Sequence, residues 1–140
     1  MRTRDEGSVL VLVIGLSLVL FALVAVVVDV SAVVLAKRGL DSSADGAAVA
    51  AAQQVDVAAA GDGFGDRLPL DPALVAGAAA TYEAGGRAGE PGLRLTARPE
   101  GTDTAAVDAT RTLRLPLTAF LGVGSAVVHA QSRARSPVGP

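Results

Sequence analysis

The sequence predicts an α+β fold, in which a long N-terminal transmembrane helix continues outside the membrane and is followed by a short second helix and a small antiparallel β-sheet. Three observations support this prediction. An apolar run occupies residues 9–28, apolar residues that are mostly alanine recur at three- and four-residue spacing over 40–55, and three later segments alternate with period two. They divide the 140 residues into a membrane segment and one small domain.

The apolar run from Val9 to Val28 contains no charge, amide side chain or proline. Its twenty residues would span roughly 30 Å as a helix, which is the thickness of bilayer hydrocarbon. The basic residues before the run lie closer to it than Lys37 and Arg38, which lie after it. We therefore expect residues 1–8 in the cytoplasm, residues 9–28 in the membrane and the rest of the chain outside, in a single-pass protein of the cell (cytoplasmic) membrane.

A cleaved export signal is the competing interpretation of this run. Val34 and Ala36 occupy the small-residue positions of a cleavage site ahead of Lys37. The apolar run is longer than the roughly 7–15 residues of a secretory signal, which favours a retained anchor. The alternative is a small exported binding protein released by cleavage after Ala36.

We expect the helix to continue outside the membrane through 29–60, from about Ser8 to Ala60 in all, with Gly61 and Gly63 ending it. One face of this extension carries small residues at strict four-residue spacing: Ala44, Ala48 and Ala52. Small residues let helices approach closely, so this is a predicted packing face, against the chain's own sheet or a neighbouring subunit. The alternative is that alanine is simply the best helix former.

Asp29 interrupts the apolar sequence at the predicted membrane edge. An acid near lipid is costly and often functional. At the edge it can reach the headgroups, which is the interpretation we favour. The alternative is a bond to an arginine, lysine or terminal amine of a partner helix.

Residues 61–135 are expected to form a small α+β domain outside the membrane. Asp71 is suited to the N-cap of a short helix, Pro72 to its first turn, and Gly85 to its end. Three segments of alternating polarity follow, beginning near Leu93, Val107 and Ala126, with turn residues at 99–101. They predict an antiparallel sheet with one packed and one wet face, and residues 136–140 are expected to be a flexible tail.

No catalytic, cofactor-binding or metal-binding residues are predicted, and no cofactor is implied. His129 is the one histidine and there is no cysteine, so His129 is expected to be a surface strand residue. Asp41 and Asp45 are too few for calcium, which takes six or more oxygens. The net charge is −2, and charged residues of both signs are scattered along the chain without a basic stripe that could bind nucleic acid. No small-molecule substrate is evident. An enzyme with an unfamiliar site is the weakest alternative.

The order of features over residues 4–55 resembles a known family. RDEGSVLVLVIGLSLVL is followed by VVVDVSAVVLAKRGLDSSADGAAVAAA, so a charge and a glycine open the apolar helix, an aspartate closes it, and a basic pair and an alanine-rich repeat follow. This segment resembles pilus-assembly proteins of the TadE/TadG-like group, in particular the actinobacterial TadG-related proteins of the Flp/Tad (type IVb) pilus system. LGVGSAVVHAQSRA resembles their closing segment more loosely.

The resemblance implies a membrane-anchored, pseudopilin-like protein that acts structurally, as a minor pilin-like or accessory subunit of Flp (Tad) pilus assembly or a related secretion apparatus. Its partners would be the membrane and other pilus-assembly proteins or pilin-like subunits. Prepilins are cut after a glycine, and the fifth residue of the mature helix is glutamate. Gly7 and Ser8 match a possible processing position, but the fifth residue after Gly7 is Leu12. The resemblance therefore favours an uncleaved anchor.

Overall fold

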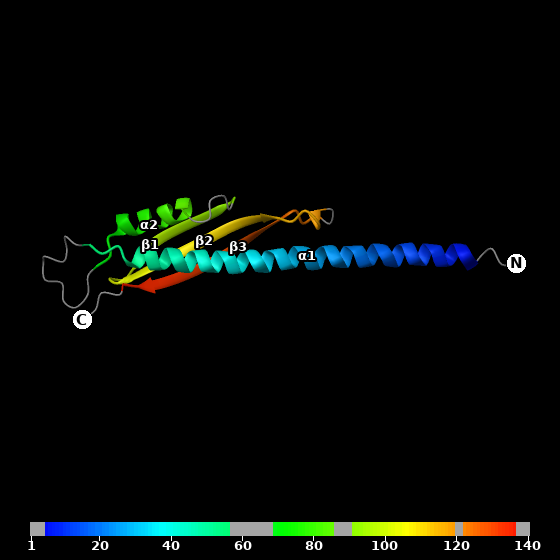
Figure 1. The fold of residues 1–140 in the computed structure, drawn as a ribbon, viewed down its shortest axis with the longest axis horizontal. Helices are drawn as coiled ribbons and strands as arrows, with labels where there is room; N and C mark the ends of the chain where they lie inside the picture. The colour runs from blue at the N-terminus through cyan, green and yellow to red at the C-terminus, as the bar shows by residue number, and fades with distance from the viewer. Residues whose placement is uncertain (1–4, 57–68, 86–90, 120–121, 137–140) are drawn as a thin grey trace.

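The structure, a computed structural model, describes residues 5–56, 69–85, 91–119 and 122–136. The described residues form α1 (Asp5–Ala52), α2 (Pro72–Gly85), β1 (Leu93–Glu100), β2 (Thr104–Arg114) and β3 (Ser125–Arg135). The prediction of an α+β fold with a long first helix, a short second helix and a small antiparallel sheet is confirmed (Figure 1). Beyond Ser136, the expected flexible tail lies outside the described residues.

Helix α1 is continuous over 48 residues, which corresponds to about 72 Å at 1.5 Å per residue. Only its C-terminal half lies beside the sheet, and its N-terminal half projects beyond the rest of the molecule (Figure 1). The helix therefore has two parts in different surroundings, although nothing in its backbone separates them.

The end of α1 differs from the prediction that it runs from about Ser8 to Ala60. It ends at Ala52, because Val55 leaves the helix to form an isolated antiparallel bridge with Leu70. Alanine-rich sequence favours helix wherever it occurs, and this bridge to a distant residue overrides the preference. Residues 57–68, which include the glycines expected to end the helix, lie outside the described part of the chain.

The sheet has the order β1-β2-β3, and both pairings are antiparallel. Its register aligns Leu95 with Ala109 and Ala109 with Ala130, so apolar residues of all three strands share one face. The turn between β1 and β2 occupies residues 101–103, two residues later than the predicted 99–101, since Glu100 still pairs with Thr104. As predicted, one face of the sheet packs in the core and the other faces solvent.

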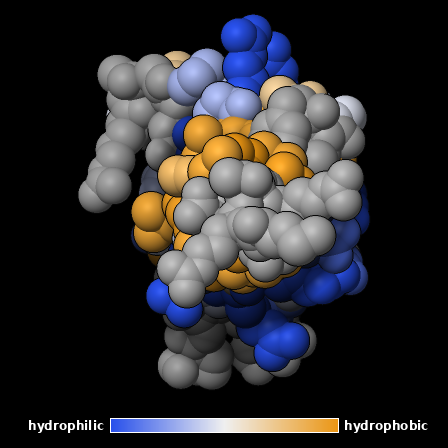
Figure 2. All heavy atoms as spheres, turned by 90° about the vertical axis from the view of Figure 1, so that its right-hand side faces the viewer, coloured by the Kyte–Doolittle hydropathy of each residue, from blue (hydrophilic) through white to orange (hydrophobic). Residues whose placement is uncertain are grey.

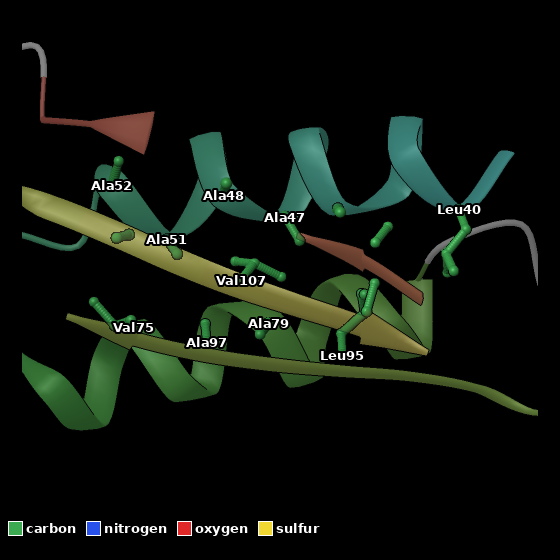
Figure 3. Packing of buried hydrophobic residues seen from close by; sticks show 14 of the residues in the cluster. Leu40, Ala47, Ala48, Ala51, Ala52, Val75, Ala79, Leu95, Ala97 and Val107 are labelled. Carbon is green, nitrogen blue, oxygen red and sulfur yellow. The ribbon is translucent and has the colours of Figure 1, made fainter. Parts of the chain in front are cut away.

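Both helices contribute to a single core against this apolar face (Figure 3). α1 packs mainly on β2 and β3, while α2 packs on β1. The buried residues are small or medium-sized: Leu40, Ala44, Ala47, Ala48, Ala51, Ala52, Leu70, Val75, Ala79, Leu95, Ala97, Ala105, Val107, Ala109, Val128 and Ala130. A core so rich in alanine brings the backbone of α1 close to the sheet.

Helix α2 begins where the sequence predicts. One carboxylate oxygen of Asp71 accepts hydrogen bonds from the backbone N–H groups of Ala73 at 2.7 Å and Leu74 at 3.2 Å, as an N-cap does. Near its other end, Glu83 accepts a hydrogen bond from the backbone N–H of Leu95 at 2.8 Å. This contact ties α2 to the edge strand β1.

Candidate functional site at the membrane end of the domain

The N-terminal half of α1 exposes its apolar side chains. Between Val9 and Val28 every large hydrophobic side chain is at least 38% exposed, and Phe21 reaches 75%. Looking along α1 from its N-terminal end, Figure 2 shows hydrophobic residues gathered in the middle of the view. Among the described residues, α1 is the one helix long and apolar enough to cross a membrane. It fits a single-pass membrane anchor.

Among the side chains of α1 that the structure describes, which begin at Val9, Asp29 is the first that is buried, with 4% of its surface exposed. Thr118, in the connection between β2 and β3, donates two hydrogen bonds to one oxygen of the Asp29 carboxylate. The backbone N–H donates at 2.7 Å and the hydroxyl at 2.8 Å. The carboxylate is turned toward its own domain, a partner that the sequence did not suggest. Contact of Asp29 with lipid headgroups, or with a basic group of a partner helix, stays a prediction.

The position of Asp29 on the helix explains this contact. Asp29, Val33, Leu40 and Ala44 follow one another at intervals of four, seven and four residues, which places them on one helix face. Leu40 and Ala44 are fully buried against the sheet, and Val33 packs against the same core. The spacing was therefore a usable signal that Asp29 faces the domain, although it could not identify Thr118.

The connection between β2 and β3 folds back on itself around Thr118. The backbone N–H of Val123 donates to the carbonyl oxygen of Thr118 at 3.3 Å, and the Thr118 hydroxyl also lies 3.0 Å from the carbonyl oxygen of Val123. Gly122 takes a φ of 84°, a backbone conformation that favours glycine. Asp29 thus contacts a turn that is already internally hydrogen-bonded.

The predicted packing face of α1 lies in the core of the chain itself. Ala44 and Ala48 are fully buried and Ala52 is 2% exposed, all in the cluster under the sheet. Of the two partners left open by the sequence, the chain's own sheet occupies this face. A neighbouring subunit would have to meet other sides of α1.

Gly46 has a packing role that the sequence did not reveal. A Cβ atom built on Gly46 would lie 2.1 Å from the hydroxyl oxygen of Tyr82 and 2.7 Å from its ring. The ring of Tyr82 on α2 therefore lies directly against the backbone of α1. Gly39 has open space at the same point, so only one of these two helix glycines is needed for packing.

The polar residues weighed as candidates for chemistry have structural neighbours. Asp41 forms an ion pair with Lys37 one turn earlier, and Asp45 accepts a hydrogen bond from Ser132 at 2.6 Å. His129 is exposed on the outer face of β3. In the described ranges, no three histidine, cysteine or acidic side chains gather where they could hold a metal ion.

The outer face of the sheet is polar and carries ion pairs. Arg98 is hydrogen-bonded to Asp108, and this bond lowers the pKa of Asp108 below its ordinary value. Arg133 donates to Glu100 at 2.6 Å, which raises the pKa of Arg133. Surface pairs of this kind contribute little stability, so α1 and the core hold the domain together.

Gly7 and Ser8, the possible processing position, lie within the first turns of α1. Their backbone is helical. The uncleaved anchor that the resemblance favours stays a prediction.

Comparison with known proteins concerns α1. Residues 7–54 match the family model Tad, described as "Putative Flp pilus-assembly TadE/G-like". The resemblance predicted over 4–55 is thus confirmed, and this segment relates the chain to pilus assembly. The match covers nearly all of α1 and stops before α2 and the sheet. Searches of curated proteins and of solved structures found no match to the chain.

Proposed function

We propose that this protein is a membrane-anchored minor pilin-like or accessory subunit of Flp (Tad) pilus assembly or a related secretion apparatus. The observation that carries the proposal is that the family match at 7–54 covers a helix whose first half is apolar and exposed. A helix of this kind can anchor a subunit in the membrane and also pack beside similar helices.

The division of α1 suggests how the subunit would act. Its C-terminal half already carries the sheet on the alanine face, so partner helices would contact the exposed apolar half, around residues such as Leu16 and Leu23. The action is structural, through helix packing, with no chemical step. The domain would be carried outside the cytoplasmic membrane, with the N-terminus inside.

Cross-linking in the native membrane tests this proposal. The chain has no cysteine, so L16C and L23C each introduce a single thiol on the exposed half, and A48C is the matched control in the core. We expect L16C and L23C, but not A48C, to cross-link to proteins that mass spectrometry identifies as pilin-like or Tad pilus-assembly subunits. Deletion of the gene should also reduce the number of pili. Normal piliation after deletion, with no such cross-link, would exclude the proposal.

Retention of the anchor is part of the proposal. Cleavage after Ala36 would cut α1 within continuous helix and would remove Asp29 and Val33, which both contact the domain. These contacts support a chain that keeps its N-terminal helix. The intact mass of the protein from membrane and culture-fluid fractions tests this. A soluble chain beginning at Lys37 would instead support the exported binding protein.

A further inference from the structure

The connection between β2 and β3 has the composition of a membrane-contacting loop. Residues 115–124 read LPLTAFLGVG and contain no charge. Of the described residues in this loop, Leu117 is 43% exposed and Val123 is 52% exposed. The loop lies at the end of the sheet beyond which the exposed N-terminal half of α1 projects (Figure 1). The exposed apolar residues Leu117 and Val123 therefore belong to the end of the domain that is nearest the anchor.

The bond between Asp29 and Thr118 fixes the depth of this loop. Asp29 directly follows the apolar run 9–28, and the hydrogen bonds of 2.7 and 2.8 Å hold Thr118 beside it. If the run fills the hydrocarbon, Leu117 next to Thr118 lies at the level where the hydrocarbon ends. The loop therefore reaches the bilayer without any movement of the domain.

The exposed side of α1 beyond Asp29 is also apolar. Val30, Val34 and Leu35 are 56%, 49% and 72% exposed. These apolar side chains would contact water if the membrane ended at Asp29. Roughly 40–45 Å of bilayer less roughly 30 Å of hydrocarbon leaves about 5–8 Å for each of the two interfacial layers, which is about four or five helical residues. Residues 29–33 therefore match one interfacial layer, with Val34 and Leu35 at its outer edge, and Thr118, bonded to Asp29, lies at the level where this layer begins.

We propose that the described residues of the β2–β3 loop form a second membrane contact, in which Leu117 and Val123 insert into the lipid interface beside residues 29–33 of α1. Lipid is the occupant because this apolar surface continues directly from the exposed surface of the anchor. Basic residues lie just beyond this layer on α1, Lys37 and Arg38, and at the end of β2, Arg114, and long basic side chains can extend to the headgroups from such positions. The anchor and the loop together would hold the domain at a fixed tilt and height.

The buried acid acquires a role in this arrangement. An acid in an interfacial layer needs partners other than bulk water, and the two donors of Thr118 supply them. Asp29 is therefore a positioning residue, which holds the loop at the depth where its apolar side chains meet lipid.

Single tryptophans test the contact, because the chain contains no tryptophan. L117W is compared with F21W, inside the span, and with L74W, a leucine of similar exposure at the far end of α2. The full chains are reconstituted in phosphatidylcholine–phosphatidylglycerol vesicles with or without lipids brominated near the top of the acyl chains. We expect L117W to show blue-shifted emission and quenching by brominated lipid between those of F21W and L74W. V123W should behave like L117W, and it provides a second probe if L117W folds poorly.

The outcomes separate the contact from the anchor. Quenching of L117W and V123W no greater than that of L74W, with F21W quenched, would overturn the loop contact and leave the anchor intact. Blue-shifted emission that neither brominated lipid nor aqueous iodide quenches would mean that a second copy of the chain covers the loop, which also overturns the proposal. In the L117W background, D29A should lose lipid quenching while D29N retains it, and unchanged quenching in D29A would overturn the positioning role.

Discussion

The two halves of α1 form one continuous helix, but their side chains suit two different surroundings, lipid for the first half and the sheet for the second. The first half, up to Val28, uses large aliphatic side chains in all directions and exposes them. The second half, from Asp29 on, places small residues on one face and buries them under the sheet. Lipid accommodates bulk on every side, whereas close packing on a sheet requires small side chains. The change from large to small residues, with Asp29 at the boundary, therefore separates the membrane part from the protein part.

Adding bulk to the buried face should have the largest effect. A48L inserts a larger side chain into a fully buried position, and such overpacking costs about 1–3 kcal/mol. A32L is the matched control, because Ala32 lies on the exposed side of the same helix. We expect A48L to lower the midpoint of urea unfolding of the domain in detergent micelles clearly, and A32L to leave it nearly unchanged. Equal effects would mean that the two sides of α1 are not packed differently.

The boundary residue should have the next largest effect. D29A leaves the backbone N–H of Thr118 without its acceptor, at a cost of about 1–2 kcal/mol for a buried donor, while the hydroxyl can donate to the carbonyl oxygen of Val123 instead. D29N keeps an oxygen where both donors point, so it should be much closer to the native protein. Hydrogen exchange at the Thr118 amide measures this directly. Faster exchange in D29A alone is the expected result, and native exchange rates in D29A would show that the contact does not hold the turn.

The two glycines of the packed half should respond in opposite directions. G39A replaces glycine where there is open space, so it should stabilise the helix by about 1 kcal/mol. G46A gains the same helix preference but forces the ring of Tyr82 away from α1, so it should be destabilising on balance. Thermal unfolding of the two variants in the same detergent tests this. Two increases in melting temperature would mean that Tyr82 moves aside at little cost.

Much of this architecture could be predicted from local patterns. The three- and four-residue spacing of small residues indicated the helix that packs, and the period-two alternation indicated the strands, because each reflects the geometry of one element. The end of α1 at Ala52 could not be predicted, since it depends on a bridge between Val55 and Leu70. Local preference contains no information about such a distant contact.

The candidate site was predictable only in part. Asp29 stood out as an acid in apolar sequence, and its spacing from Leu40 and Ala44 indicated which way it faces. Its partner Thr118 is 89 residues away, in a connection that had no polar pattern to mark it. The same limit applies to Gly46, because only the folded chain brings Tyr82 against it.

The smallest effect is expected on the sheet face turned away from α1. The hydrogen bond from Arg98 lowers the pKa of Asp108 below its ordinary value of 3.8, so the pair adds stability above that pH and loses it as the pH falls through the lowered pKa. Because the pair lies at the surface, D108N should cost about 0.5 kcal/mol or less at neutral pH. Urea unfolding of both proteins at neutral pH and in acid, below the pKa of Asp108, should show this difference disappearing in acid. A loss as large as that of A48L would mean that the outer face, and not the buried half of α1, holds the domain together.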